Sequence, residues 1–288
     1  MSGSDQPVVF LKLGGSLITD KNRPHTPRME VIRRLAAEIL AARMKDASLR
    51  ILLGHGSGSF GHVPARRYGT RQGVRTEQEW RGFVEVWREA VQLNRIVVDA
   101  LGEAGLPAIS LPPSSSTLAR DGQVESWNLA PVRRALEASL LPVVFGDVVF
   151  DSQRGGTILS TEDLFSYLAE QLQPQRILLA GIEAGVWADF PSCTRLVDEI
   201  TPASWNDLSA TVGGSTAPDV TGGMASKVRQ SLELVGRISN LEVFIFSGES
   251  MGAIEQALNG AHLGTRIRAG QVRLGVERGG SYNQGEPL

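Results

Sequence analysis

The sequence contains one cysteine, Cys193, among 288 residues, and it has no long apolar run. A single cysteine excludes an internal disulfide framework and a cysteine-based metal cluster, and it suits a reducing compartment. No apolar run approaches the roughly 18–20 residues that span a bilayer. The first residues, MSGSDQPVVFLKLGG, lack the apolar length of a signal peptide. These absences predict a soluble, cytoplasmic protein with no membrane partner.

The sequence also lacks an excess of charge of either sign. It has 29 Lys and Arg residues against 31 Asp and Glu residues, a net charge of −2. A near-neutral chain has no bulk field that would attract nucleic acid or an anionic membrane. With 42% hydrophobic and 21% charged residues, the composition also excludes collagenous, coiled-coil and disordered proteins. We therefore expect a small-molecule partner and no nucleic-acid partner.

Short apolar runs alternate with longer amphipathic stretches along the chain. The runs predict strands at 8–13, 51–53, 108–111, 142–145, 176–180 and 243–246, and the stretches predict helices at 29–44, 77–101, 129–140, 160–172, 224–236 and 251–258. This alternation is typical of an α/β protein with a mainly parallel sheet covered on both faces. No repeat or linker interrupts it, so we expect one domain over 1–275 with two lobes. The Gly-rich residues 276–288 are expected to form a flexible tail.

Three Gly-rich stretches lie where phosphate-binding loops are expected in such a sheet. They are KLGGS at 12–16, GHGSGSFGH at 54–62 and DVTGGMASK at 219–227. Glycines at strand ends let backbone N–H groups approach phosphate oxygens. Two of the stretches contain a lysine, Lys12 or Lys227, and Lys21 follows nine residues after Lys12. Several anion cradles with fixed cations suit a polyphosphate, whose transfer is catalysed mainly by positioning and charge neutralisation.

Two familiar nucleotide motifs fit less well. Gly56, Gly58 and Gly61 match the G-x-G-x-x-G pattern of dinucleotide-binding enzymes, but they follow the second predicted strand and not the first. A dehydrogenase is therefore a minor alternative. The stretch from Gly222 to Lys227 lacks the Gly-Lys-Ser/Thr ending of a P-loop, so a P-loop enzyme is not expected.

Five motifs occur in a characteristic order: LKLGGSLITDK, GHGSGSFGH, PVVFGDVVFD, ILSTED and DVTGGMASK. Together they resemble the amino acid kinase superfamily and, more closely, its isopentenyl phosphate kinases and the related fosfomycin kinases. The resemblance covers about residues 8–268. It implies the open αβα sandwich of the amino acid kinase fold, with an acceptor lobe at about 1–172 and a nucleotide lobe at about 173–275. It also implies ATP with Mg²⁺, a phosphorylated small-molecule acceptor and a homodimer.

The resemblance assigns roles to four side chains. Lys12 bridges the transferred phosphoryl group, Lys227 binds the ATP phosphates, Lys21 stabilises the transition state, and His62 donates a hydrogen bond to the acceptor phosphate. Lysine is a compact point charge, and imidazole can donate to phosphate at neutral pH, so each residue type suits its role. The resemblance assigns nucleotide contacts to small residues: Gly14, Gly15, Ser16, Gly58, Gly185 and Gly223. No side chain is predicted as a metal ligand.

The sequence departs from the family pattern around the acceptor. Ser57 replaces a usual glycine, and Thr161 replaces the glycine of an SGDD motif, so both are expected to face the acceptor. Glu162 replaces the aspartate that organises the lysines, and Asp163 and Asp147 are alternatives for that role. The expected acidic residues near the nucleotide are shifted, with Glu183 one place away.

The resemblance implies an ATP-dependent enzyme that converts isopentenyl phosphate to isopentenyl diphosphate in isoprenoid biosynthesis. One alternative is a kinase for another small phosphate or phosphonate, such as fosfomycin. Another is a non-catalytic binding protein on the same fold, although Lys12, Lys21 and Lys227 are all present. The 77–101 helix is expected to pack its apolar face into the core, and one end of that face is expected to line an alkenyl pocket closed by Tyr68 and Gly69. Its apolar face comprises Trp80, Phe83, Val84, Trp87, Val91, Val97 and Val98.

Overall fold

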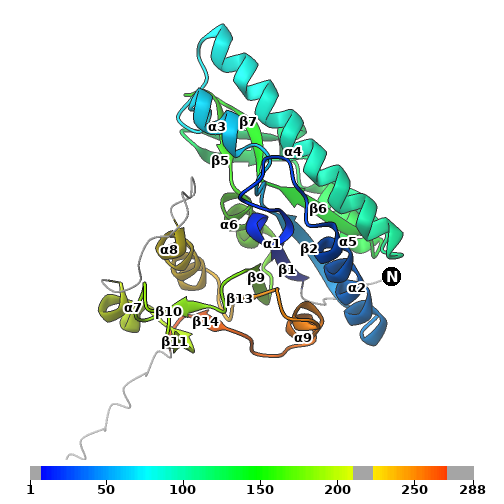
Figure 1. Cartoon of the computed structure of the whole chain (residues 1–288), viewed down its shortest axis with the longest axis vertical. Coiled ribbons are helices and arrows are strands. Elements are labelled where there is room, and N and C mark those ends of the chain that lie inside the picture. Colours follow the sequence, from blue (N-terminus) through cyan, green and yellow to red (C-terminus); the bar gives the residue numbers. More distant parts are fainter. Residues whose placement is uncertain (1–7, 210–222, 271–288) are drawn as a thin grey trace, which may run out of the picture.

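A central eight-stranded sheet runs through the computed structural model, which describes residues 8–209 and 223–270 (Figure 1). Its strands are β1 (Val8–Leu13), β2 (Arg50–His55), β3 (Ala108–Ser110), β6 (Leu141–Phe145), β9 (Arg176–Gly181), β12 (Glu199–Ile200), β13 (Glu242–Ser247) and β14 (Thr265–Arg268). They are ordered β12-β14-β13-β9-β1-β2-β6-β3. Every neighbouring pair is parallel except β13 with β14, so the predicted mainly parallel sheet is confirmed.

Helices cover both faces of this sheet. The longer ones are α2 (Met29–Lys45), α4 (Glu77–Glu103), α5 (Ala130–Glu137), α6 (Thr161–Leu172) and α8 (Gly223–Arg237), and the shorter ones are α1 (Gly15–Ile18), α3 (His62–Tyr68), α7 (Pro202–Leu208) and α9 (Ala253–Leu258). Side chains alternate along a strand. On β1, Phe10 therefore joins a buried cluster with α6, while Leu11 joins one with α2 and α4. Two cores on opposite faces make the predicted αβα sandwich.

A second sheet was not predicted from the sequence. It contains β4 (Thr117–Arg120), β5 (Gln123–Trp127), β7 (Asp147–Asp151) and β8 (Gly155–Leu159), ordered β5-β4-β7-β8. These strands are short and partly solvent-facing, since Leu118 and Phe150 are exposed. Their apolar runs are therefore weak signals beside the buried parallel strands. A two-stranded sheet of β10 (Val186–Trp187) with β11 (Leu196–Val197) and a 3₁₀ turn η1 (Pro113–Ser115) complete the described elements.

The apolar face predicted on α4 is only partly buried. Phe83 and Val97 are in the core, as expected, but Val84 and Trp87 are 45% and 39% exposed. That part of the prediction is wrong because α4 extends beyond the central sheet, as Figure 1 shows, and packs there against α3 and β7 of the smaller sheet. Among the described residues, no helix is long and apolar enough to cross a membrane. The lobe boundary near residue 172 stays a prediction, and the expected tail lies outside the described residues.

Two glycine-containing loops pack against each other beside the ends of β1 and β2. A Cβ atom on Gly15 would lie 2.3 Å from the nitrogen of Gly58. Gly58 has φ +54°, and a Cβ there would lie 2.0 Å from Thr19 Oγ1. That hydroxyl donates to the Gly15 carbonyl at 2.7 Å and accepts from the Ser59 N–H at 2.8 Å. The glycines are therefore required for close backbone approach in addition to any ligand contact.

Replacing Gly58 with alanine should destabilise the protein. The substitution combines a left-handed backbone with a clash against Thr19, so we expect the free energy of unfolding to fall by at least about 2 kcal/mol. Urea denaturation measures this change. Gly102→Ala is the control, because Gly102 is in α4 with nothing within 4 Å of its would-be Cβ. It should be neutral or stabilising by up to about 1 kcal/mol. Equal stabilities for the two variants would contradict the packing argument.

Candidate active site

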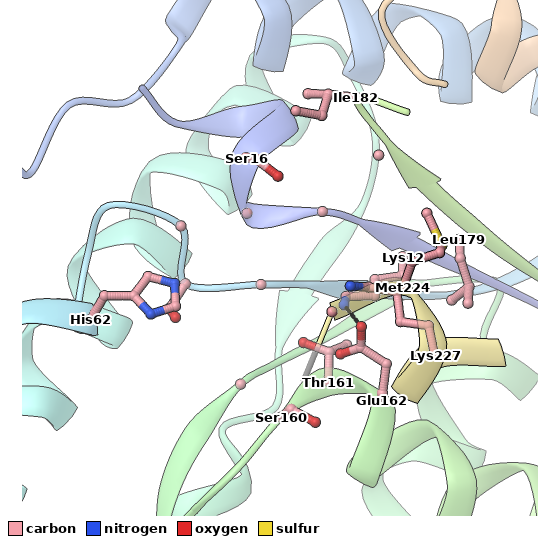
Figure 2. A pocket seen from close by; sticks show the side chains of 18 of the residues that line it. Lys12, Ser16, His62, Ser160, Thr161, Glu162, Leu179, Ile182, Met224 and Lys227 are labelled. Carbon is pink, nitrogen blue, oxygen red and sulfur yellow. Dashed lines mark ion pairs between the residues drawn. The ribbon is translucent and has the colours of Figure 1, made fainter. Parts of the chain in front are cut away.

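A cavity of about 350 Å³ opens at the carboxyl ends of the central parallel strands. Ligands in open α/β sheets bind at this edge. The cavity is lined by all the predicted site residues except Gly185, namely Lys12, Gly14, Gly15, Ser16, Lys21, Ser57, Gly58, His62, Thr161, Gly223 and Lys227. Figure 2 shows Lys12, Glu162 and Lys227 gathered on one side and His62 on the other. The fold therefore brings together residues that are far apart in sequence.

Gly185 does not line the cavity, so its predicted nucleotide contact is not supported. A Cβ on Gly185 would lie 2.6 Å from Thr265 Oγ1. That hydroxyl accepts from the Val186 N–H at 2.8 Å and donates to the Val197 carbonyl at 2.5 Å. Glycine is thus needed here for packing against β14. The neighbouring residues Glu183 and Trp187 do line the cavity.

Glu162 is the acid that pairs with Lys12, a choice that the sequence left open. It is the second residue of α6, and its carboxylate forms an ion pair with the Lys12 ammonium group. Both side chains are at least 90% buried. Burial alone would raise the pKa of Glu162, but the charges of Lys12 and then Lys227 hold it below its usual value. An ionised Glu162 therefore orients Lys12 and lies in the field of both lysines.

The other two candidate acids have different partners. Asp163 forms the capping box of α6, accepting from the Ser160 N–H at 2.8 Å, and it also pairs with Arg71. Asp147 accepts from the N–H groups of Ser114 at 3.2 Å and Val148 at 2.9 Å. Burial raises the pKa of Asp147 to about 6. Asp147 thus joins η1 to β7 in the wall of the cavity.

Lys21, predicted to stabilise the transition state, and His62, predicted to contact the acceptor phosphate, occupy a loop and a helix start. Lys21 is exposed in the segment between α1 and α2, and His62 is the first residue of α3. Thr161 is buried and donates its hydroxyl hydrogen to the His55 carbonyl at 2.6 Å. This hydrogen is therefore already used inside the protein. Ser57 is partly buried and lines the cavity.

His55, the last residue of β2 before the second glycine loop, is a structural residue. It is buried, stacks on Phe145 with ring centroids 5.5 Å apart, and lies 3.1 Å from both the Asn94 amide nitrogen and the Gly56 carbonyl oxygen. Burial is the main cause that lowers the pKa of His55 to about 4. The imidazole is therefore neutral at pH 7.

The cavity continues into an apolar wall that the sequence placed incorrectly. From α4 it receives Val86 and Ala90, and not the predicted Trp80 or Trp87. Ala65, Ile158 and Leu159 add to this wall. Neither Tyr68 nor Gly69 lines the cavity; the Tyr68 ring packs against Gly82 on α4. Val86 and Ala90 are spaced i, i+4 with buried neighbours, and this spacing was the available signal.

Comparisons with known proteins identify the family of this chain. The profile of the Amino acid kinase family matches residues 7–247. The chain belongs to the amino acid kinase family. It is 32% identical to the isopentenyl phosphate kinase of Methanocaldococcus jannaschii and 36% identical to that of Methanothermobacter thermautotrophicus. Each alignment covers 90% of this chain and 98% of the relative.

A solved structure of an isopentenyl phosphate kinase superposes on this chain with a TM-score of 0.76 and is 32% identical to it in sequence. The alignment covers 90% of this chain and 99% of that chain. A carbamate kinase from Giardia lamblia, at 15% identity and a TM-score of 0.67, shares the fold. The predicted family, fold and kinase class are therefore confirmed.

The buried carboxyl of Asp147 gives a testable pH dependence. Its pKa is near 3.8 in the unfolded chain and about 6 in the folded protein, so between these values the folded state holds more protons. The contribution of Asp147 to the free energy of unfolding therefore falls as pH rises through this range. His55, with a pKa lowered from 6.5 to about 4, contributes the opposite slope.

Asp147→Asn removes the contribution of Asp147, which falls with pH, from the free energy of unfolding. It leaves the contribution of His55, which rises with pH. We expect the unfolding free energy of the variant to rise more steeply with pH than that of the wild type between about pH 4 and 6. The difference in slope should reach about 1.4 kcal/mol per pH unit. Urea denaturation at several pH values within this range measures both slopes. Parallel curves for the two proteins would contradict the assignment.

Proposed function

We propose that this kinase transfers a phosphoryl group from ATP to isopentenyl phosphate and forms isopentenyl diphosphate. The observation that carries the proposal is one cavity with a cationic end and an apolar wall. Lys12 and Lys227 lie near Glu162 at the cationic end, and Val86 and Ala90 belong to the wall. Five curated relatives bear the name isopentenyl phosphate kinase.

The lysine end suits the phosphates of ATP. Lys12 and Lys227 spread the negative charge that develops as the γ-phosphoryl group moves, and Lys21 approaches it from the exposed segment. An oxygen of the acceptor phosphate forms the new bond to the γ-phosphorus. The bond from that phosphorus to the β–γ bridging oxygen breaks, and ADP leaves with the electron pair. No general base is required, because a phosphate monoester is already ionised near pH 7.

The other end suits a short alkenyl phosphate. His62 donates to the phosphate, with Ser57 beside it as a second polar group of the lining. The five-carbon tail would lie against Ala65, Val86 and Ile158, and each buried methylene contributes about 0.8 kcal/mol. A polar phosphonate such as fosfomycin would gain less from this wall, so we place it second.

Mg²⁺ fits this site as an ion held mainly by the nucleotide. Among residues 8–209 and 223–270, no group of three His, Cys, Asp or Glu side chains could hold a metal ion. Mg²⁺ is commonly bound by one or two carboxylates together with substrate phosphates, and Glu162 is the carboxylate nearest to Lys12. When bound, the ion neutralises phosphate charge. A homodimer and a cytoplasmic location complete the proposal; both rest on the sequence and the family resemblance.

The substrate is tested by ADP release with MgATP and isopentenyl phosphate, dimethylallyl phosphate or fosfomycin. We expect turnover with the five-carbon phosphates. Lys21→Ala should lower kcat by about a hundredfold, because one transition-state contact is lost. His62→Ala should raise the KM for the acceptor about tenfold or more. Lys45→Ala and His262→Ala, which change residues that do not line the cavity, are matched controls. Turnover with fosfomycin alone would overturn the proposed substrate.

Glu162→Gln tests the role of the buried acid. The substitution keeps the size of the side chain but removes the charge that orients Lys12, so we expect kcat to fall roughly ten- to a hundredfold. Glu170→Gln, on the same helix but in a half-exposed pair with Arg237, is the control and should keep wild-type kcat. Equal kcat values for the two variants would show that Glu162 does not organise the lysine.

A further inference from the structure

Asp163 accepts hydrogen bonds from two side chains that are far apart in the sequence. Its Oδ2 atom lies 3.0 Å from Arg71 Nη2, and its Oδ1 atom lies 3.1 Å from Gln230 Nε2. The side chain is only 11% exposed. The capping box with Ser160 fixes Asp163 on the first turn of α6. The carboxylate is therefore a fixed point to which the two partners are held.

Each partner belongs to one side of the cavity. Arg71 follows α3, the helix that begins with His62, and it lines the cavity itself. Gln230 is on α8 three residues after Lys227. Residues three apart lie on the same helix face, so Gln230 and Lys227 both face α6. Glu162 and Asp163, adjacent on α6, thus interact with these two neighbouring positions of α8.

We propose that Asp163 is a positioning residue that couples the acceptor side of the cavity to the helix carrying Lys227. The inference rests on the proposed function in two respects, namely that Lys227 contacts ATP and that the acceptor binds beside His62. A largely buried carboxylate that loses one donor is left undersatisfied, and its remaining partner must adjust. Removal of Arg71 should therefore shift Asp163 and, through Gln230, change the position of Lys227 on the opposite side of Asp163.

The coupling is tested with Gln230→Ala, Arg71→Ala and the double variant. Gln230→Ala removes one donor and leaves both the capping box and the Arg71 pair in place. We expect it to weaken ATP binding about three- to tenfold, as measured by calorimetry. It should also raise the KM for ATP more than it lowers kcat. Gln256→Ala, which removes an exposed glutamine from α9, is the matched control and should bind ATP like the wild type.

The double variant decides between coupling and independent contacts. If both residues act through Asp163, Arg71→Ala weakens ATP binding in the wild-type background and has a smaller effect once Gln230 is alanine. Independent sites give additive effects within about twofold. Additive effects, or an unchanged ATP affinity in Gln230→Ala, would overturn the proposal. Unchanged melting temperatures would show that the affinity changes do not arise from loss of folding.

A second readout uses both substrates. The KM for ATP is measured at low and at saturating acceptor concentration, and Gln230→Ala should reduce the dependence of one KM on the other substrate. Failure of the inference can be distinguished from failure of the proposed function. Wild-type protein that binds ATP but does not phosphorylate isopentenyl phosphate would contradict the substrate assignment, and the calorimetric cycle would still test the coupling.

Discussion

The ion pair between Lys12 and Glu162 is the interaction on which the rest of the site depends. Both groups are almost fully buried, and removing two charges from water costs free energy that a single pair repays poorly. Under the proposed function the site receives a polyanion, and the phosphate oxygens of ATP then offset this cost as further partners of Lys12 and Lys227. The field of both lysines also keeps Glu162 ionised.

The placement of this pair follows from the sandwich. Lys12 is the penultimate residue of the buried strand β1, and Glu162 is near the start of α6, which packs Phe165 against Phe10 with ring centroids 5.0 Å apart. Strand and helix are thus held by apolar packing, and the charged groups are positioned at the sheet edge. The close contact between Gly15 and Gly58 holds together the two glycine loops that line the cavity.

The cavity has one charged end and one apolar wall, so it can bind a phosphate and a hydrocarbon group of the same molecule. Its charged end favours phosphate, whereas its wall from α3, α4 and β8 is apolar. The smaller sheet contributes to both parts, because β8 supplies Ile158 and leads directly into Ser160 and α6. Asp163 stands at this junction and contacts residues from either side. A substrate with a phosphate and a short hydrocarbon tail satisfies both ends.

Much of this protein was determined by sequence alone. The alternation of strands and helices, the glycine loops and the lysines at 12, 21 and 227 are local features, so they predicted the fold class, the kinase family and the glycines and lysines that line the cavity. The tertiary structure decided which of three nearby acids pairs with Lys12, because that depends on how α6 is rotated against β1. It also decided that Gly185 packs on Thr265 and that Val86 and Ala90 face the cavity. These outcomes depend on contacts between elements that are distant in sequence. Only the i, i+4 spacing of Val86 and Ala90 left a local signal, and it does not say which surface those side chains face.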